Sequence, residues 1–292
     1  MDYVIITDSA ANIPTELAQK HGIEIIPFSY FMDGKEHVCR DTAKWSCHNY
    51  YQKIRDGARV STSQINPQKY VDFFTPFLKE GKNILFVGLS SGVSGSFASA
   101  QIAQKQLSEE FPDRKLVLID SLGASMGEGL LALKAAVLRK EGFSLRTVKE
   151  ELLRARDRMF QVFTVDDLMH LKRGGRLSGI SAGIGTVLNI KPILTGNAQG
   201  KIIAFSKVRG RKKAIEALAA KYEELVENQA VQTVAISQAD CPEDAAYLAS
   251  IIAQSKPPKD IITVDFEPVT GSYVGPGALA LFFLSHDNVR LK

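Results

Sequence analysis

Apolar stretches alternate with longer amphipathic segments over the first half of the chain. Four stretches have the length and composition of buried strands, and they cover residues 3–8, 23–31, 84–89 and 116–121. Between them, apolar residues recur at the spacing of a helix face, most clearly over residues 67–78 and 97–111. Strands that alternate with helices predict an α/β domain in which helices cover both faces of a doubly wound parallel sheet and make three layers.

Residues typical of helix ends fall where this alternation places them. Asn66-Pro67 precedes one predicted helix and Asn12-Ile13-Pro14 precedes another, which is the expected order of a cap and a first-turn proline. Glycines typical of C-terminal caps lie near four expected helix ends, at Gly22, Gly57, Gly81 and Gly142. Caps and periodicity therefore predict the same helices.

After a charged helical segment at residues 145–159 the pattern changes. Shorter apolar runs follow, separated by turns and by a few longer helices, and they cover residues 161–165, 202–208, 231–237 and 261–266. This pattern favours a second, two-layer α+β domain. We place the two domains at residues 1–159 and 160–292. Because no low-complexity linker separates them, we expect the domains to pack closely and shape a cleft.

Composition narrows the class of protein. The 292 residues are 45% hydrophobic and 23% charged, as in globular proteins with a sizeable core. The formal charge of +4 gives no reason to expect nucleic-acid binding, and no apolar run approaches the roughly 18 residues that span a bilayer. Residues 1–4 lead into a strand pattern without a charged signal region, so we expect a cytoplasmic protein. Because no heptad pattern is visible, we expect a monomer.

The cysteine pattern gives no sign of a metal site. Cys39, Cys47 and Cys241 lack CxxC spacing, and their odd number argues against a disulfide framework. No other metal-ligand spacing occurs in the sequence. We therefore expect neither a metal nor a cofactor.

A turn rich in serine and glycine at residues 89–96 carries the strongest chemical signal. It reads Leu-Ser-Ser-Gly-Val-Ser-Gly-Ser between a predicted strand and a predicted helix, where unpaired backbone N–H groups favour a carboxylate or a phosphate. Ser94 is the best-placed hydroxyl, because Gly92 and Gly95 let a ligand approach the backbone. A similar turn at residues 61–64, Ser-Thr-Ser-Gln, precedes another helix. We expect the two turns to share one pocket for an acidic head group.

Other polar turns have simpler explanations or weaker signals. Ser9, Asp120 and Ser121 follow strands, where such side chains usually satisfy local backbone groups. Residues 271–277, Gly-Ser-Tyr-Val-Gly-Pro-Gly, precede an apolar segment at 278–284, which we interpret as a helix with Pro276 in its first turn. This interpretation predicts a third helix start suited to an anion.

A serine hydrolase is the alternative enzymatic interpretation. Residues 88–92 match G-x-S-x-G after a strand, which makes Ser90 the candidate nucleophile. The order Ser, Asp, His leaves His286 as the late histidine, in a polar segment typical of the surface. No HGGG-like oxyanion segment is present, and few strands precede Ser90. Nucleotide binding has little support, because the sequence lacks GK[ST] after residues 88–95 and GxGxxG at any helix start.

Two segments are densely basic. Residues 171–177 end a short helical segment, where two glycines are typical of a C-cap and the basic side chains complement the helix dipole. Residues 207–213, Lys-Val-Arg-Gly-Arg-Lys-Lys, lie between a strand and a helix. They form either a solvated loop or a docking site for an acidic partner. A subunit that acts mainly by docking through Lys207–Lys213 is therefore a third hypothesis.

Taken together, these stretches resemble the DegV family, the bacterial fatty-acid-binding proteins that present acyl chains to a fatty acid kinase. The matching segments occur in order along nearly the whole chain, at residues 6–9, 62–64, 90–96, 119–121, 125–127, 171–177, 188–194, 208–210 and 275–277. The resemblance implies a two-domain fold that encloses a long-chain, palmitate-like fatty acid, with the carboxylate held by the hydroxyls of Thr62 and Ser94. It also implies that the partner kinase supplies the phosphoryl chemistry and that this chain is not an enzyme.

The resemblance also marks site residues. We expect ligand-binding residues at Thr62, Ser63, Ser94, Gly95, Ser121, Ser125 and Tyr273. Partner docking is expected at Arg209 and Arg211, and transient contact with a membrane surface is compatible with this role. Tyr273 departs from the family, which commonly has histidine in the segment G-x-H-x-G-P-G. Either Tyr273 donates a hydrogen bond to the head group, or the ligand range or the coupling to the kinase differs.

Elementary energetics favour a lipid carrier. A palmitate-like chain buries about fourteen methylenes, which at about 0.8 kcal/mol each gives on the order of 11 kcal/mol before ordering and association costs. The carboxylate is harder to bury, because an ionised acid without partners is strongly unfavourable in the interior. The hydroxyls of Thr62 and Ser94 and helix N-terminal N–H groups are the expected compensation. None is a formal countercharge, so we expect the bound acid to be partly protonated.

Pocket-lining and core residues share one composition. We therefore interpret the apolar candidates Ile26, Phe28, Leu168 and Phe282 as core residues rather than as the lining of a lipid tunnel.

Overall fold

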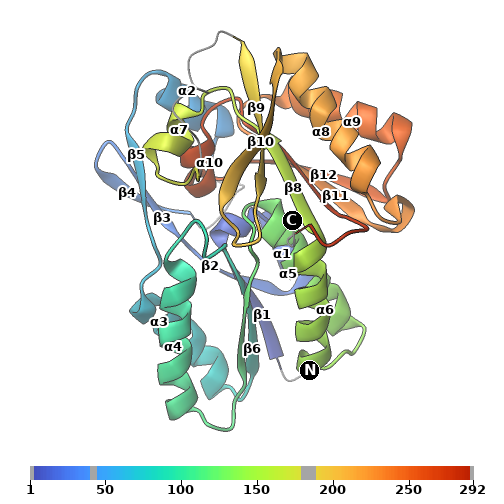
Figure 1. Ribbon diagram of the computed structural model, residues 1–292. Helices are drawn as coiled ribbons and strands as arrows, with labels where there is room; N and C mark the ends of the chain where they lie inside the picture. The colour runs from blue at the N-terminus through green and yellow to red at the C-terminus, as the bar shows by residue number, and fades with distance from the viewer. Residues whose placement is uncertain (1–2, 40–44, 179–188, 290–292) are drawn as a thin grey trace.

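A four-stranded parallel sheet forms the centre of the N-terminal half (Figure 1). The computed structural model describes residues 3–39, 45–178 and 189–289. The strand order is β2-β1-β6-β7, and each neighbouring pair is parallel. The strands are β1 Tyr3–Asp8, β2 Ile23–Ile26, β6 Asn83–Gly88 and β7 Leu116–Asp120.

Helices cover both faces of this sheet. Phe74 of α3 and Leu107 of α4 belong to the same buried cluster as Ile6 on one face, whereas Leu131 of α5 packs with Ile5 on the other. The predicted three-layer α/β arrangement is confirmed. The helices of this half are α1 Thr15–His21, α2 Cys47–Arg55, α3 Pro67–Lys79, α4 Ser96–Glu110, α5 Met126–Lys140 and α6 Leu145–Arg158, with a 3-10 turn at Ser9–Ala11.

The predicted strand at residues 23–31 is two strands in different sheets. After β2, Pro27 has no N–H to continue the ladder, and the chain leaves the parallel sheet. It enters an antiparallel sheet of order β4-β3-β5, formed by β3 Ser29–Met32, β4 Lys35–Val38 and β5 Val60–Ser63. Thr62 pairs there with Tyr30, so the turn predicted at residues 61–64 is mostly a strand.

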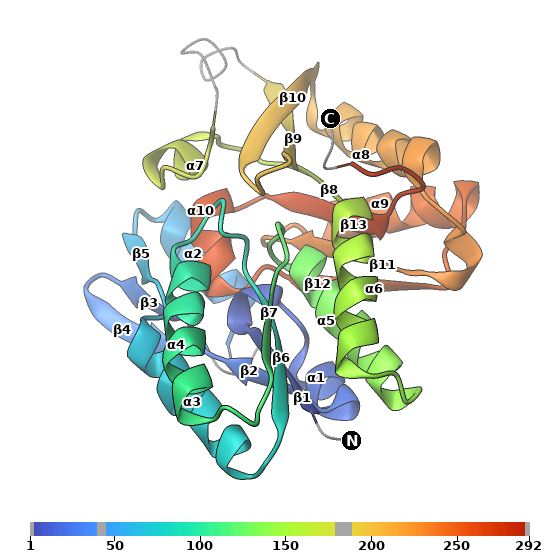
Figure 2. The same cartoon turned by 60° about the horizontal axis from the view of Figure 1, so that its bottom comes forward.

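A six-stranded mixed sheet organises the C-terminal half, with helices α8 and α9 packed on one face (Figure 2). The strand order is β10-β9-β8-β13-β11-β12. The predicted α+β class of this half is confirmed. The elements are β8 Met159–Thr164, α7 Met169–Arg173, β9 Ile190–Gly196, β10 Ile202–Arg209, α8 Arg211–Leu225, β11 Thr233–Gln238, α9 Pro242–Ser255, β12 Asp260–Asp265, α10 Pro268–Val274 and β13 Leu279–Leu284, with a 3-10 turn at Gln229–Val231.

The interpretation of residues 278–284 as a helix is wrong. This segment is β13, a central strand that pairs with β8 and β11 and is buried on both sides. A continuous apolar run of this length suits a fully buried strand as well as a buried helix. Pro276 follows α10 instead of starting a helix, so the predicted third helix N-terminus at this turn does not exist.

Helix caps mostly agree with the predictions. Positive φ angles occur at all four predicted cap glycines, next to the ends of α1, α2, α3 and α5. Asn66 caps α3 by accepting a hydrogen bond from the Lys69 N–H at 2.9 Å. Asn12 does not cap α1, whose N-cap is Pro14. Its buried side chain instead donates to the Ser125 hydroxyl at 3.2 Å.

An aromatic cluster ties α2 to α10. The Trp45 ring lies 5.4 Å from the Tyr50 ring, which lies 5.0 Å from the Tyr51 ring. The Tyr50 hydroxyl donates to the Pro268 carbonyl at 2.7 Å, and the Tyr51 hydroxyl donates to the Phe266 carbonyl at 2.9 Å. Both bonds reach the start of α10, so α2 fixes the position of that helix.

One buried apolar cluster contains residues of both halves, including Ile5 and Leu131 together with Phe163 and Phe282. The halves thus share core, and the boundary between residues 159 and 160 stays a prediction. Of the helices that the structure describes, none combines the length and apolar character needed to cross a membrane. Leu188, from one of the matching segments, lies outside the described residues.

Candidate functional site

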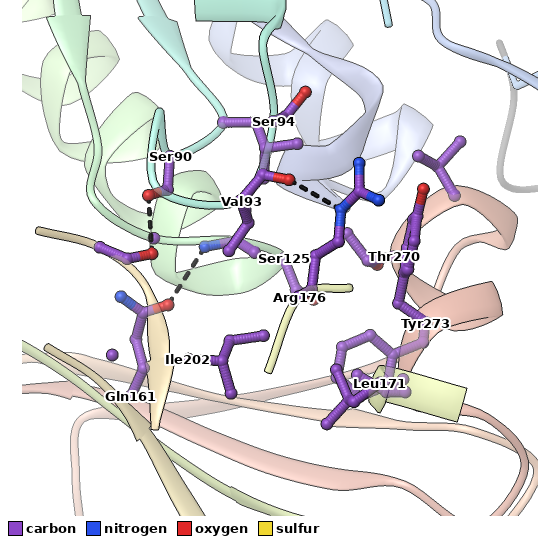
Figure 3. A pocket seen from close by; sticks show the side chains of 18 of the residues that line it. Ser90, Val93, Ser94, Ser125, Gln161, Leu171, Arg176, Ile202, Thr270 and Tyr273 are labelled. Carbon is purple, nitrogen blue, oxygen red and sulfur yellow. Dashed lines mark hydrogen bonds between the residues drawn. The ribbon is translucent and has the colours of Figure 1, made fainter. Parts of the chain in front are cut away.

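A cavity of about 340 Å³ lies between the two halves, within the size range of small-molecule sites (Figure 3). Its wall draws on the small antiparallel sheet, on the six-stranded sheet, on α7 and α10, and on the turns after β6 and β7. Its apolar lining includes Phe28, Leu89, Val93, Phe163, Leu171, Ile202, Phe266, Val274 and Phe282. Its polar lining includes Thr62, Ser63, Gln64, Ser90, Ser94, Ser125, Gln161, Arg176, Thr270 and Tyr273.

Thr62 and Tyr273 meet at one side of the cavity. The end of β5 supplies Thr62, and the last turn of α10 supplies Tyr273. Their hydroxyl oxygens are 2.6 Å apart, so one hydroxyl donates to the other. The hydroxyl that accepts this bond keeps its own hydrogen, which it can donate to an acidic ligand.

Arg176 brings a positive charge to the same place. Its guanidinium lies 4.5 Å from the centre of the Tyr273 ring, and its Nε donates to the Val93 carbonyl at 3.0 Å. Gly174 allows this packing, because a Cβ there would overlap the Tyr273 ring. From the sequence, the basic residues at 171–177 are expected to complement the helix dipole, with no countercharge at the site. The structure corrects this expectation, since Arg176 lines the cavity.

Ser94 and Gly95 also lie on the cavity wall. The Ser94 hydroxyl donates to the Ser96 hydroxyl at 3.1 Å and accepts from the Ser96 N–H at 3.2 Å. The Ser96 hydroxyl in turn accepts from the Ile65 N–H at 3.1 Å, which connects the turn after β6 to the segment after β5. Gly95 leaves room for Gln64, whose side chain a Cβ would overlap. The two predicted donor segments therefore share one cavity.

Ser125 and Ser121 have different surroundings. Ser125 lines the cavity beside Gln161, and its hydroxyl lies 2.9 Å from the Ser237 hydroxyl. Ser121 is not among the lining residues. Its hydroxyl donates to the Gly123 carbonyl and accepts from the Gly123 N–H, both at 3.1 Å, which matches the alternative interpretation of a turn residue.

Two of the four apolar core candidates line the cavity. Phe28 and Phe282 form part of its wall, whereas Ile26 and Leu168 belong to the packed clusters. The interpretation of Phe28 and Phe282 as ordinary core residues is therefore wrong, because both line the cavity. Gln161 was missed, since a glutamine in an apolar strand carries no signal of its own. Its side chain accepts from the Ala124 N–H at 3.1 Å.

Three carboxyl groups of the described residues are buried, and two of them hold elements of the cavity wall. Asp8 accepts from the Leu89 and Ala10 N–H groups, each at 2.9 Å, and burial raises its pKa to about 7. Glu128 accepts from the Thr7 hydroxyl at 2.9 Å, and burial together with Asp8 raises its pKa well above the usual range. Glu267 caps α10 by accepting from the Thr270 and Val269 N–H groups at 2.6 Å. Asp8 and Glu267 thus hold two elements of the wall, the turn after β6 and the helix α10.

Ser90 lacks the surroundings of a hydrolase nucleophile. Its buried hydroxyl donates to the Gly200 carbonyl at 2.9 Å and accepts from the Gly92 N–H at 3.1 Å. Within the described residues, no hydrogen bond joins Ser90 to a histidine. His286 instead lies 3.1 Å from the Glu224 carbonyl.

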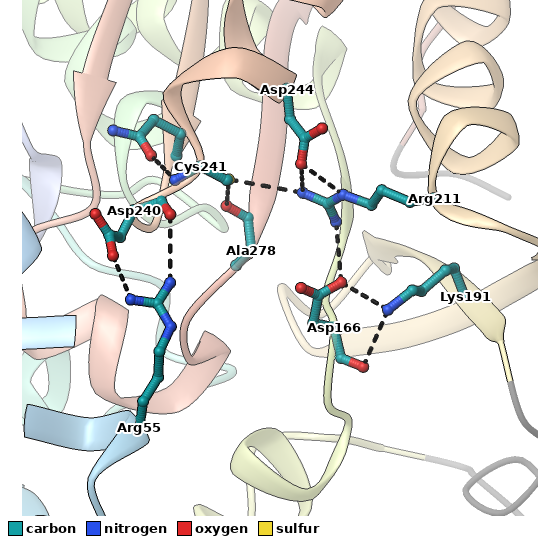
Figure 4. A network of polar contacts seen from close by, with 9 residues as sticks. Arg55, Asp166, Lys191, Arg211, Asp240, Cys241, Asp244 and Ala278 are labelled. Atoms are coloured by element: carbon teal, nitrogen blue, oxygen red, sulfur yellow. Dashed lines mark hydrogen bonds and ion pairs between the residues drawn. The ribbon is translucent and has the colours of Figure 1, made fainter. Parts of the chain in front are cut away.

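The two arginines predicted for docking in the segment 207–213 have different surroundings, and Figure 4 shows those of Arg211. Arg209 is exposed at the end of β10. Arg211 begins α8 and pairs with Asp244 at 2.8 Å and with Asp166 at 3.5 Å. Asp166 also pairs with Lys191 at 2.6 Å. The docking role predicted for both arginines therefore suits Arg209 better, because Arg211 has acidic partners within the chain.

This chain is similar to known proteins over both of its halves. The sequence model of the DegV family, described as uncharacterised proteins, matches residues 2–286. A DegV domain-containing protein of Clostridium perfringens is 37% identical over 282 residues, 97% of each chain. A fatty-acid-binding DegV family protein from Thermus thermophilus has a TM-score of 0.88 at 31% identity and covers 98% of this chain and 100% of its own. A Ruminococcus gnavus DegV family structure with vaccenic acid has a TM-score of 0.87 at 26% identity and covers 97% and 99%.

Proposed function

This chain belongs to the DegV family, and from that premise we propose that it binds one long-chain fatty acid and presents it to a fatty acid kinase. The acyl chain occupies the cavity between the two halves, and the carboxylate lies at the side formed by Thr62, Tyr273 and Arg176. One observation carries this proposal: a mostly apolar cavity meets hydroxyls and a guanidinium at one side.

The head-group side has the chemistry of a carboxylate site. Arg176 supplies a positive charge that favours the ionised acid, and the Thr62–Tyr273 pair supplies a neutral donor beside it. The phenol of Tyr273 takes the place in which the family commonly has histidine. In this chain the positive charge therefore comes from Arg176 and the hydrogen bond from Tyr273.

The kinase contributes the reaction in this scheme. Transfer of a phosphoryl group to the bound carboxylate forms an acyl phosphate, and the partner supplies the nucleotide and the catalytic groups. This chain contributes the bound acid, the site around its carboxylate and a docking surface that includes Arg209. It performs no catalysis itself.

Extraction of the purified protein followed by mass spectrometry tests the carrier. We expect a co-purifying long-chain fatty acid, or uptake of added palmitate with about one molecule per chain. A protein that carries no fatty acid and binds none on addition contradicts the proposal.

A fluorophosphonate probe tests the hydrolase alternative on the same preparation. Covalent labelling of Ser90 would favour a hydrolase, whereas the buried and doubly hydrogen-bonded hydroxyl predicts no labelling.

A further inference from the structure

The β9–β10 hairpin forms one wall of the cavity and lies at the edge of its own sheet. Gly196, Gly200 and Ile202 from this hairpin line the cavity. The two strands pair with each other at seven positions between Ile190 and Arg209. In the part of the chain that the structure describes, only Thr195 and Leu194 pair with β8. Ile193 and Leu194 anchor the middle of β9 in the core, and the Ile202 carbonyl accepts from the Ser178 N–H at 2.9 Å. The part of the hairpin that lies beyond these anchors is its turn at residues 197–200.

The tip of this hairpin rests on the N-terminal half. It turns at residues 197–200 and reaches the loops that follow β6 and β7 (Figure 1). The Gly200 carbonyl accepts the hydroxyl of Ser90 at 2.9 Å, as Figure 3 shows at the edge of the cavity. Ser90 has 1% of its surface exposed, so this bond is shielded from water.

Two glycines allow the hairpin and the turn after β6 to approach each other closely. A Cβ at Gly92 would overlap the backbone of Gln199 and Gly200. A Cβ at Gly200 would overlap the Ser90 hydroxyl and the backbone of Leu122. The two backbones therefore meet with no side chain between them, and Ser90 is the side chain that bonds across the contact.

We propose that Ser90 is a positioning residue that latches the β9–β10 hairpin onto the turn after β6 and thereby closes the cavity around its ligand. This inference rests on the proposed function, because the enclosed ligand is the fatty acid. Release of the Ser90–Gly200 bond lets the turn of the hairpin move away from the loop after β6, and the fatty acid enters and leaves while the site is open. In this proposal, the serine of the G-x-S-x-G match holds the cavity closed and is not a nucleophile.

A latch has a kinetic signature that a simple contact lacks. When a site must open before a ligand moves in either direction, a larger open fraction raises both the association and the dissociation rate constants. Loss of a contact to the ligand raises the dissociation rate constant alone. The association rate constant therefore distinguishes the two roles.

Three variants measured by stopped-flow fluorescence with cis-parinaric acid make the test. Ser90→Ala removes the bond, and Gly92→Ala wedges the two backbones apart without removing a hydroxyl. Both variants should raise both rate constants by about five- to tenfold, the effect of losing one hydrogen bond. Ser91→Ala, which changes an exposed neighbour, should keep the wild-type values.

Hydrogen exchange of the wild-type protein gives a second measurement that needs no variant. Amides of residues 194–202 should exchange faster than those of β13, and bound fatty acid should slow them. The proposal is overturned if these amides exchange as slowly as those of β13, or if both folded variants keep the wild-type association rate constant. If the wild-type protein binds no cis-parinaric acid, the proposed function fails, and exchange in the free protein still decides whether the hairpin opens.

Discussion

Three side chains from distant parts of the sequence converge on the head-group side of the cavity. Thr62 comes from a small antiparallel sheet, Arg176 from the segment after α7, and Tyr273 from α10. Arg176 stacks on the Tyr273 ring, and Tyr273 shares a hydrogen bond with Thr62. Each residue therefore positions the next, and the charge and the donor face the same ligand group.

Removing the guanidinium tests the countercharge. We expect Arg176→Ala to weaken palmitate binding by about 10- to 100-fold, since a charge-assisted hydrogen bond contributes about 1.5–3 kcal/mol. Arg176→Lys should recover part of the loss, because it keeps the charge without the planar fork. Isothermal titration with Arg173→Ala as the matched control decides the question, and equal affinities for the two alanine variants would contradict the assignment.

Removing the hydroxyls tests the neutral donors. The double variant Thr62→Val with Ser94→Ala should weaken fatty acid binding by about 30-fold, because two hydrogen bonds of about 1 kcal/mol each are at stake. Its thermal unfolding should stay within a few degrees of the wild type. An unchanged dissociation constant in a titration would count against the proposed head-group site.

The buried pair of Asp8 and Glu128 makes stability depend on pH. Because burial raises the pKa of Asp8 to about 7, the folded protein holds a proton between about pH 4 and pH 7 that the unfolded chain has released. The free energy of unfolding should therefore fall as the pH rises through this window, by on the order of 4 kcal/mol.

Glu128→Gln should flatten that dependence. The amide does not titrate, so the folded variant no longer holds the extra proton that the raised pKa of Glu128 retains in the wild type. Urea denaturation at pH 4.5 and pH 7.5 measures the difference, with the exposed Glu150→Gln as control. A slope equal to that of the wild type would show that the pair does not share this proton.

Single residues also mark the limit of the sequence analysis. That Ser94 and Thr62 share one cavity could be predicted, because two turns rich in hydroxyl groups precede helices in the sequence. The place of Arg176 at the cavity could not be predicted, because a basic residue after a glycine pair is fully explained by a helix end. Its approach to Val93 joins residues far apart in the chain, which no local pattern encodes.

Among the elements, α10 depends on support from α2. The Tyr51 hydroxyl bonds to the Phe266 carbonyl just before this helix, and Gly271 faces that hydroxyl with no room for a Cβ. The orientation of Tyr273 is thus set by a helix that does not touch the head group.

Tyr51→Phe tests this support. The variant should lose about 1–2 kcal/mol of stability, because the Phe266 carbonyl loses a buried donor, and it should bind fatty acid more weakly through displacement of α10. Tyr247→Phe, whose hydroxyl bond to Glu216 is exposed, is the matched control. Urea denaturation and a palmitate titration measure the two effects. If the variant is less stable but binds fatty acid with the wild-type affinity, α2 does not influence the ligand site.

The elements that the sequence predicted well have local signals, and those that it missed do not. The parallel strands of the N-terminal half have β-branched runs, and their helices have caps such as Asn66. Residues 278–284 form a strand only because β8 and β11 lie on either side, and an apolar run alone does not contain that information. The small antiparallel sheet was also missed, because Pro27 divides what looks like one strand.

At the scale of the molecule, the cavity and the basic end of β10 belong to one functional arrangement. The exposed Arg209 lies at the end of a strand whose beginning, Ile202, lines the cavity. A partner that docks at Arg209 therefore contacts the same hairpin that we propose closes the site. If the proposed partner docks there, we expect docking and ligand release to be coupled through this strand.

Charge reversal tests the docking surface. We expect Arg209→Glu to lower acyl phosphate formation by a purified fatty acid kinase by about tenfold or more, because a favourable ion pair becomes a repulsion. Fatty acid affinity should remain at the wild-type value. Lys105→Glu, an exposed change on α4, serves as control, and equal rates for both variants would contradict docking at this surface.

The aromatic cluster beneath α10 gives the molecule an optical property. The sequence contains one tryptophan, Trp45, so all indole emission comes from a single point. The Trp45 ring contacts Tyr50, whose hydroxyl bonds to the first residue of α10, the helix that carries Tyr273. Unlabelled protein in a cuvette therefore contains its own reporter of that helix, sensitive to shifts in emission wavelength and to energy transfer from the neighbouring phenols.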